Sequence, residues 1–223
     1  MRVRKGEILC VLRQTYPNAR PELNFTNPYE TLVATMLSAQ CTDKQVNKVT
    51  PAVFRDFPDA RAMAAIDEDT LYPYVKSCGF KSKAHNIVAA CRIICEKHGG
   101  EVPSTMEELT QLPGVGRKTA NVVLANAFNI PSIAVDTHVF RVSNRLGLAN
   151  ADNVLDTEMQ LRHAIPREDW SDAHHWLIWH GRRVCSARNP ACDRCPLSAL
   201  CKTYQQQNKP QRADKHESDA ASL

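Results

Sequence analysis

The segment LPGVGRKTANVVLANAF, residues 112–128, is the most informative stretch of this chain. Its first residues separate two helical patterns, a short one over 104–111 and a longer one over 117–128. Gly114 and Gly116 allow a tight turn with positive φ and a close approach of another backbone. Gly116 also precedes the start of a helix, where unpaired N–H groups and the positive end of the helix dipole point outward. The segment therefore predicts an anion site, for which a DNA phosphate is a natural occupant.

Two helices joined by such a turn form the helix-hairpin-helix pattern, which holds the DNA backbone without reading base sequence. The candidate DNA-binding residues of this hairpin are Leu112, Gly114, Val115, Gly116 and Arg117. We expect the side chain of Val115 to pack inward. The alternative is a turn that only reverses the chain, and the full string LPGVGRKTA makes it much less favoured than a bare Gly-x-Gly would.

Two residues near the hairpin carry groups suited to catalysis. Lys118 falls in the first turn of the helix over 117–128, where the positive dipole end makes a lysine unfavourable. A Schiff-base nucleophile needs a neutral amine, although an exposed lysine that contacts phosphate would explain the same position. Asp136 follows an apolar run and can cap the next helix. A capping carboxylate is fixed in position, so it can also stabilise positive charge on a sugar or activate a neighbour.

Four of the nine cysteines share a short segment near the C-terminus, with the spacing C-x6-C-x2-C-x5-C, at Cys185, Cys192, Cys195 and Cys201. Four thiolates this close can form a tetrahedral metal site or hold an iron–sulfur cluster. Zinc ribbons usually use two C-x2-C pairs, and this segment has one, so the spacing favours iron–sulfur over zinc moderately. We expect His174, His175 and His180, just upstream, to be core or surface residues rather than ligands.

The chain has 223 residues, 43% of them hydrophobic, and a net charge of +4. This composition suits one large or two small soluble domains and permits nucleic-acid binding without establishing it. The longest apolar run near the N-terminus, 8–12, is too short for a secretory signal, and no run approaches the roughly 18 residues of a membrane helix. We therefore expect no membrane partner and a cytoplasmic location at the nucleoid.

Helical signals recur along the chain, and strand signals are few. Asn27-Pro28 opens one helix as N-cap and first residue, and the periodicity of 83–98 predicts another. Ser104 and Glu107 predict a capping box for a short helix. The sequence predicts an all-α fold with short loops, followed by a disordered polar tail over 205–223.

Together these segments resemble the endonuclease III family of DNA glycosylases. The resemblance is carried by residues 112–128, by VDTHVFRVSNRLG at 135–147 and by the cysteine spacing. It extends to LSAQCTDKQVNK at 37–48 and GFKSKAHNI at 79–87, and it covers about residues 20–204.

The resemblance implies two helical domains that flank a DNA-binding cleft. One is a six-helix domain over 22–132, which contains the helix-hairpin-helix at about 104–128. The other joins residues 1–21 to 133–204 and carries a [4Fe-4S] cluster on the four clustered cysteines.

The resemblance also implies residue roles. Lys118 is the nucleophile and Asp136 the essential carboxylate. Gln40 fills the gap left by the extruded nucleotide, and the loop at Phe80 wedges against the orphaned base.

The implied activity is base excision repair by a bifunctional DNA glycosylase. Such an enzyme removes oxidised pyrimidines from duplex DNA and cleaves the abasic site by β-elimination through a lysine Schiff base. The expected partner is double-stranded DNA with damaged pyrimidines or abasic sites, bound by a monomer. One alternative is a monofunctional mismatch or adenine-type glycosylase, which by the same resemblance lacks a lysine at position 118. The other is a non-catalytic iron–sulfur DNA-binding protein, which needs neither Lys118 nor Asp136.

Overall fold

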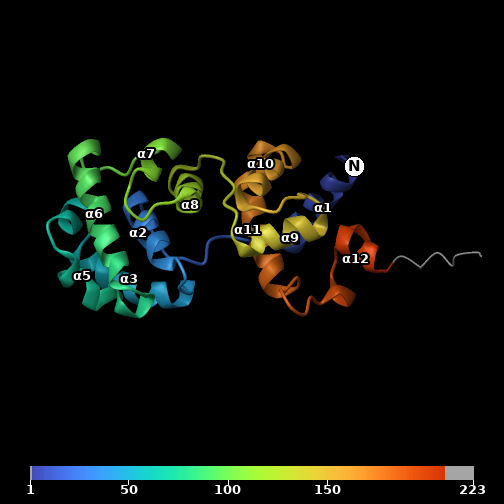
Figure 1. Ribbon diagram of the computed structural model, residues 1–223, viewed down its shortest axis with the longest axis horizontal. Coiled ribbons are helices and arrows are strands. Elements are labelled where there is room, and N and C mark those ends of the chain that lie inside the picture. Colours follow the sequence, from blue (N-terminus) through green and yellow to red (C-terminus); the bar gives the residue numbers. More distant parts are fainter. Residues whose placement is uncertain (1, 209–223) are drawn as a thin grey trace, which may run out of the picture.

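The computed structural model describes residues 2–208, and every regular element in that range is a helix (Figure 1). The α-helices are α1 (Arg2–Thr15), α2 (Pro28–Ser38), α3 (Asp43–Asp56), α4 (Ala60–Ala64), α5 (Glu68–Val75), α6 (Lys81–His98), α7 (Met106–Thr110), α8 (Arg117–Phe128), α9 (Thr137–Leu146), α10 (Val154–Ala164), α11 (Trp170–Arg183) and α12 (Lys202–Gln207). Short 3-10 turns are η1 (Lys76–Cys78), η2 (Arg167–Asp169), η3 (Cys192–Arg194) and η4 (Ser198–Leu200). The predicted all-α fold is confirmed.

The helices form two lobes that lie side by side (Figure 1). Helices α2 to α8 surround one hydrophobic core, and α1 with α9 to α11 surround a second. The short helix α12 packs against α9. The chain passes between the lobes twice, through residues 16–27 and 129–136. Two separate cores joined by two connections place a seam between the lobes, and the candidate catalytic residues lie along it.

Helix α2 lies in the middle of the first lobe, where it packs against α3, α6 and α8. It begins as predicted, because the side chain of Asn27 accepts a hydrogen bond from the amide of Glu30 at 2.9 Å and Pro28 is the first helical residue. Leu32 and Leu37 are fully buried. Each contributes roughly 1.5–3 kcal/mol to stability by leaving water.

The short helix α7 begins one residue later than the predicted capping box. The hydroxyl of Thr105 accepts the amide of Glu108 at 3.2 Å and donates to that residue's carboxylate at 2.6 Å. The prediction that Ser104 and Glu107 form this box is therefore wrong. Two adjacent hydroxyls, each followed three residues later by a glutamate, make the register ambiguous from sequence.

The second lobe joins the N-terminal helix to the C-terminal part of the chain. Ile8 and Leu12 of α1 share a core with Val139 of α9 and Leu177 of α11. Helix α9 begins at the predicted cap, since the side chain of Asp136 accepts hydrogen bonds from the amides of His138 and Val139. Among residues 2–208, no helix is long and apolar enough to cross a membrane.

We propose 22–132 as one domain and 1–21 with 133–204 as the other, in line with the two cores. The first contains seven α-helices, α2 to α8, rather than the six expected, because α4 and α7 are separate short helices of five residues. Helix α12 extends to Gln207, so the first three residues of the predicted tail, 205–207, are helical and the prediction of disorder is wrong for them. The rest of the predicted tail, from residue 209 onward, lies outside the described residues.

Candidate active site and cysteine loop

The hairpin between α7 and α8 presents its backbone outward and its apolar side chains inward. Leu112 and Val115 are buried, with 2% and 5% exposure, so only their backbone groups can reach a ligand. Gly114 has φ of +75°, and a Cβ there would lie 2.9 Å from the Cβ of Asn86. Gly116 is the N-cap of α8 and no side chain caps the amides that follow. This geometry matches an anion site built from helix N–H groups.

Arg117 differs from the other hairpin candidates, because its guanidinium pairs with a carboxylate of the second lobe. It donates two hydrogen bonds of 2.8 Å to Glu158, whose side chain is only 2% exposed. Glu158 also accepts a hydrogen bond from Asn121 at 3.2 Å and forms an ion pair with Arg162 at 2.7 Å. The hydrogen bonds to Glu158 raise the pKa of Arg117 above its ordinary value. Arg117 therefore joins the lobes in this structure, whereas the sequence suggested a DNA contact.

Lys118 and Asp136 line the same cleft between the lobes. A cavity of about 620 Å³ is bounded by Ser38 and Lys118 on one side and by Asp136, Val154 and the α9 N-terminus on the other. Lys118 is exposed and within the described residues forms no ion pair. The Oδ1 atom of Asp136 accepts hydrogen bonds from the amides of His138 at 2.8 Å and Val139 at 2.7 Å. Its second carboxylate oxygen is left for the cleft.

Two neighbouring histidines from α11 line a smaller pocket that also reaches Lys118 and Asp136. His174 is fully desolvated, and its Nδ1 lies 2.7 Å from the carbonyl oxygen of Ala134. Burial lowers the pKa of His174, and it lowers the pKa of His175 to about 3 with a further contribution from His174. Both rings are therefore neutral at physiological pH. They are core residues, as expected. The sequence did not predict that they line a pocket together with Lys118 and Asp136.

Arg182 of α11 connects three distant segments at the edge of this pocket. It lies 2.5 Å from a carboxylate oxygen of Glu22, in the first inter-lobe connection, and 3.1 Å from one of Asp43, at the start of α3. All three residues line the pocket with Lys118. Nothing local in the sequence marks this ion pair, because Arg182 is separated from its partners by 160 and 139 residues.

The two residues expected to probe the duplex lie on exposed loops of the first lobe. Gln40 follows α2 and has a positive φ of 56°, one of two non-glycine residues with positive φ in the described range. Phe80 is 77% exposed, which is unusual for a phenylalanine. The exposed ring of Phe80 and the strained backbone of Gln40, whose neighbour Cys41 lines the cleft, suit residues that enter a duplex. Their roles remain a prediction.

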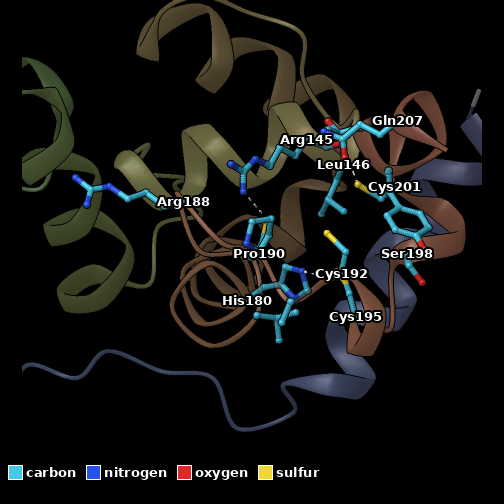
Figure 2. Close-up of a pocket in the computed structure, with 15 residues that line it drawn as sticks. Arg145, Leu146, His180, Arg188, Pro190, Cys192, Cys195, Ser198, Cys201 and Gln207 are labelled. Atoms are coloured by element: carbon cyan, nitrogen blue, oxygen red, sulfur yellow. Dashed lines mark hydrogen bonds between the residues drawn. The ribbon is translucent and has the colours of Figure 1, made fainter.

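The four clustered cysteines line one cavity of about 190 Å³ in the second lobe, between α9, α11 and the turns that precede α12 (Figure 2). Arg145 donates a hydrogen bond to Cys185 Sγ at 3.4 Å, and Cys201 Sγ contacts the Arg145 carbonyl at 3.3 Å. His180 Nε2 lies 3.6 Å from Cys195 Sγ, while its Nδ1 is 2.9 Å from the hydroxyl of Tyr16. The thiols thus surround a space and are approached by basic or N–H groups.

This cavity fits a multi-atom group better than a single ion. A structural zinc holds four sulfurs at about 2.3 Å from one point. Within residues 2–208, no three His, Cys, Asp or Glu side chains converge in a way that would hold one metal ion. Four cysteines around a larger cavity are the donor set of a cubane iron–sulfur cluster, and the hydrogen bond from Arg145 to Cys185 suits a thiolate.

Comparisons with known proteins agree with this site. Residues 33–167 match the model of the HhH-GPD superfamily base excision DNA repair proteins, and residues 185–201 match the iron–sulfur binding domain of endonuclease III. Endonuclease III from Synechocystis sp. is 51% identical over 204 residues, which is 91% of this chain and 93% of that protein. The Escherichia coli K12 enzyme is 47% identical over 201 residues, or 90% and 95%.

Solved structures give the same result. A trapped endonuclease III–DNA covalent intermediate matches with a TM-score of 0.85 and 44% identity, covering 92% of this chain and 99% of that chain. A non-covalent endonuclease III–DNA complex matches with the same TM-score and 45% identity, covering 91% and 97%. The helical lobes, hairpin and cysteine loop therefore define a base excision DNA repair protein.

Within that superfamily, the chain belongs to the endonuclease III family. It is a bifunctional DNA glycosylase and abasic-site lyase that binds DNA, and it carries a [4Fe-4S] cluster in the iron–sulfur binding domain that residues 185–201 match.

Proposed function

We propose that this chain removes oxidised pyrimidines from duplex DNA and cleaves the resulting abasic site, with Lys118 as nucleophile and Asp136 as the assisting carboxylate. The observation that carries this proposal is that both residues line one cleft between the lobes. The cleft lies next to the uncapped amides of α8, which suit a phosphate of the same strand.

The reaction begins with extrusion of the damaged nucleotide, because a stacked base is out of reach of the enzyme. The Nζ of Lys118 attacks the sugar C1′, and the glycosidic bond breaks with its electron pair leaving on the base. Asp136 stabilises positive charge that develops on the sugar. The C1′–O4′ bond then breaks, the ring oxygen takes up a proton as the Lys118 nitrogen loses one, and an iminium joins Nζ to C1′. As the 2′ proton leaves, its electron pair moves toward the iminium, and the C3′–O bond breaks with its electrons on the departing phosphate oxygen. Water then hydrolyses the iminium and frees Lys118. The strand is cut 3′ to the lesion.

The cluster has a structural role in this scheme. The four cysteines that would hold it all lie on residues 185–201, and Arg145 of α9 and His180 of α11 contact three of them. None of the residues that line the cysteine cavity lines the pockets that contain Lys118. Arg188 and Arg194 are on that loop, where they suit contacts to phosphate. We further propose that the protein acts as a monomer, in the cytoplasm at the nucleoid, on duplexes with damaged pyrimidines or abasic sites.

Lys118 also separates this proposal from its alternatives. A monofunctional glycosylase would release base without forming a Schiff base. A non-catalytic iron–sulfur protein would bind DNA and release nothing. The exposed position of Lys118 at the mouth of the cleft favours the bifunctional enzyme.

The test is borohydride trapping on a duplex that holds one oxidised pyrimidine. Wild-type protein should form a covalent adduct and Lys118→Ala should not, although both should bind the duplex. Lys97→Ala is the matched control, since Lys97 is exposed on α6 and lines neither of the pockets that contain Lys118. Base release without trapping would support the monofunctional alternative, and strand cleavage that survives in Lys118→Ala would exclude this lysine as the nucleophile.

A further inference from the structure

One ammonium group joins the two loops that carry the candidate duplex-probing residues. The Nζ of Lys83, in the first turn of α6, donates a hydrogen bond to the carbonyl of Leu37 at 2.9 Å and another to the carbonyl of Cys78 at 2.5 Å. Leu37 lies in the last turn of α2, and Cys78 is the last residue of η1. Each carbonyl is therefore near a helix end, where backbone oxygens lack intrahelical partners.

The two carbonyls lie just before the two candidate residues. Gln40 is three residues after Leu37, and Phe80 is two residues after Cys78. Each loop contains a residue with a positive φ angle, which is 56° at Gln40 and 132° at Gly79. Conformations of this kind persist only when the surroundings hold them.

The local packing supports a specific bond rather than a chance contact. A Cβ at Gly79 would come within 3.3 Å of the Lys83 Nζ, so the absence of a side chain lets the ammonium approach. A second hydrogen bond lies nearby and joins the elements next to these loops, because Gln45 Nε2 in the first turn of α3 donates to Ser77 Oγ of η1 at 2.8 Å. Hydrogen bonds from a charged donor are roughly twice as strong as neutral ones, and a cation is favoured at the C-terminal end of a helix.

We propose that Lys83 is a positioning residue that holds the Gln40 and Phe80 loops as one unit while the damaged nucleotide is extruded. The inference rests on the proposed function, in which these two side chains enter the duplex. The free energy of extrusion depends on both side chains arriving together, since one fills the gap and the other separates the strands. Loss of the ammonium should slow extrusion and leave the chemistry at Lys118 intact.

The bond itself is tested on the free holoenzyme by hydrogen–deuterium exchange. Lys83→Met keeps the length of the side chain and removes the donor. Lys97→Met removes a charge from the exposed far end of the same helix and serves as the control. Amides in 38–45 and 76–82 should exchange about tenfold faster in Lys83→Met alone. Unchanged exchange in both segments would refute the claim that the hydrogen bonds of Lys83 hold the two loops, whatever the enzyme's activity.

The role in the reaction is tested by comparing two substrates under single-turnover conditions. Base release from a duplex with an oxidised pyrimidine should fall about ten- to a hundredfold in Lys83→Met, as expected when reacting groups are misplaced. Cleavage of a preformed abasic site, which has no base to extrude, should fall less than threefold by the same reasoning. Lys83→Arg, which keeps N–H donors, should recover part of the loss. Equal losses on the two substrates would refute the positioning role.

A direct phosphate contact by Lys83 would give a different result. The slope of log affinity against log salt for undamaged duplex would then fall by about one in Lys83→Met, and that outcome would also overturn the proposal. The proposed function fails separately, if wild-type protein releases no base while exchange in the two loops still depends on Lys83.

Discussion

Replacing Glu158 with glutamine should destabilise the protein, because one nearly buried carboxylate binds Arg117 and Asn121 of the first lobe and Arg162 of its own helix. Glu158 accepts both hydrogen bonds of Arg117 and one from Asn121, and it forms an ion pair with Arg162. The amide of glutamine keeps the shape of the side chain but removes the charge. Two guanidiniums then lie close together without a counter-charge.

The size of the effect follows from the exposure of the partners. Breaking a fully buried ion pair costs about 3–5 kcal/mol. Here the side chains of Arg117 and Arg162 are 42% and 28% exposed, so water screens much of their repulsion. We expect a loss of about 2 kcal/mol, which lowers the Tm of a chain of this length by roughly 4–8 °C.

Urea and thermal unfolding of the cluster-loaded protein, followed by far-ultraviolet circular dichroism, measure this loss. Glu96→Gln is the matched control, because Glu96 is exposed on α6, and its effect should stay within about 0.5 kcal/mol. The double variant with Arg117→Met should be less destabilised than the sum of the single variants by about 1 kcal/mol. A Glu158→Gln variant no less stable than the control would refute the reasoning.

Three further outcomes are expected. Asp136→Asn should lower base release about 10²–10³-fold with little change in Tm, because asparagine caps helices as well as aspartate does; unchanged turnover would reduce Asp136 to a cap. Gly114→Ala should weaken binding to an abasic-site analogue about tenfold, since its φ of +75° and a Cβ 2.9 Å from Asn86 impose strain of about 1–3 kcal/mol; equal affinity in a filter-binding titration contradicts this. Burial lowers the pKa of His175 from its ordinary value near 6.5 to about 3, so the folded protein binds fewer protons than the unfolded chain between these values. Stability should fall as pH drops through that window, by up to about 1.4 kcal/mol per pH unit from this residue, and His175→Gln should reduce the slope measured by urea unfolding between pH 7 and pH 5.

Local signals in the sequence predicted helix ends well. Asn27-Pro28, Asp136 and the hairpin glycines each act through neighbours within four residues, so their effects can be recognised from the sequence alone. The predicted start of α7 was wrong by one residue because Ser104 and Thr105 offer equivalent caps.

Long-range partners could not be predicted in the same way. The pairing of Arg117 with Glu158 spans 41 residues, and that of Arg182 with Glu22 spans 160. Both ion pairs depend on how the two lobes pack against each other, and the hydrophobic periodicity of single helices carries no information about that packing. The convergence of Lys118 and Asp136 on one cleft was expected from the family resemblance. The two histidines that line a pocket with them were not predicted, because that pocket is formed by segments far apart in the sequence.

The path of the chain between the lobes also determines the order in which the protein can form during synthesis. Helices α2 to α8 are contiguous, so the first lobe has its whole core once Phe128 has been made. Helix α1 is made first but its partners extend to Leu197. At roughly 5–20 residues per second, its apolar face remains without those partners for about 10–40 s. The four cysteines follow α1, α9, α10 and α11 in the sequence, so the cluster can be inserted only after these helices have been made.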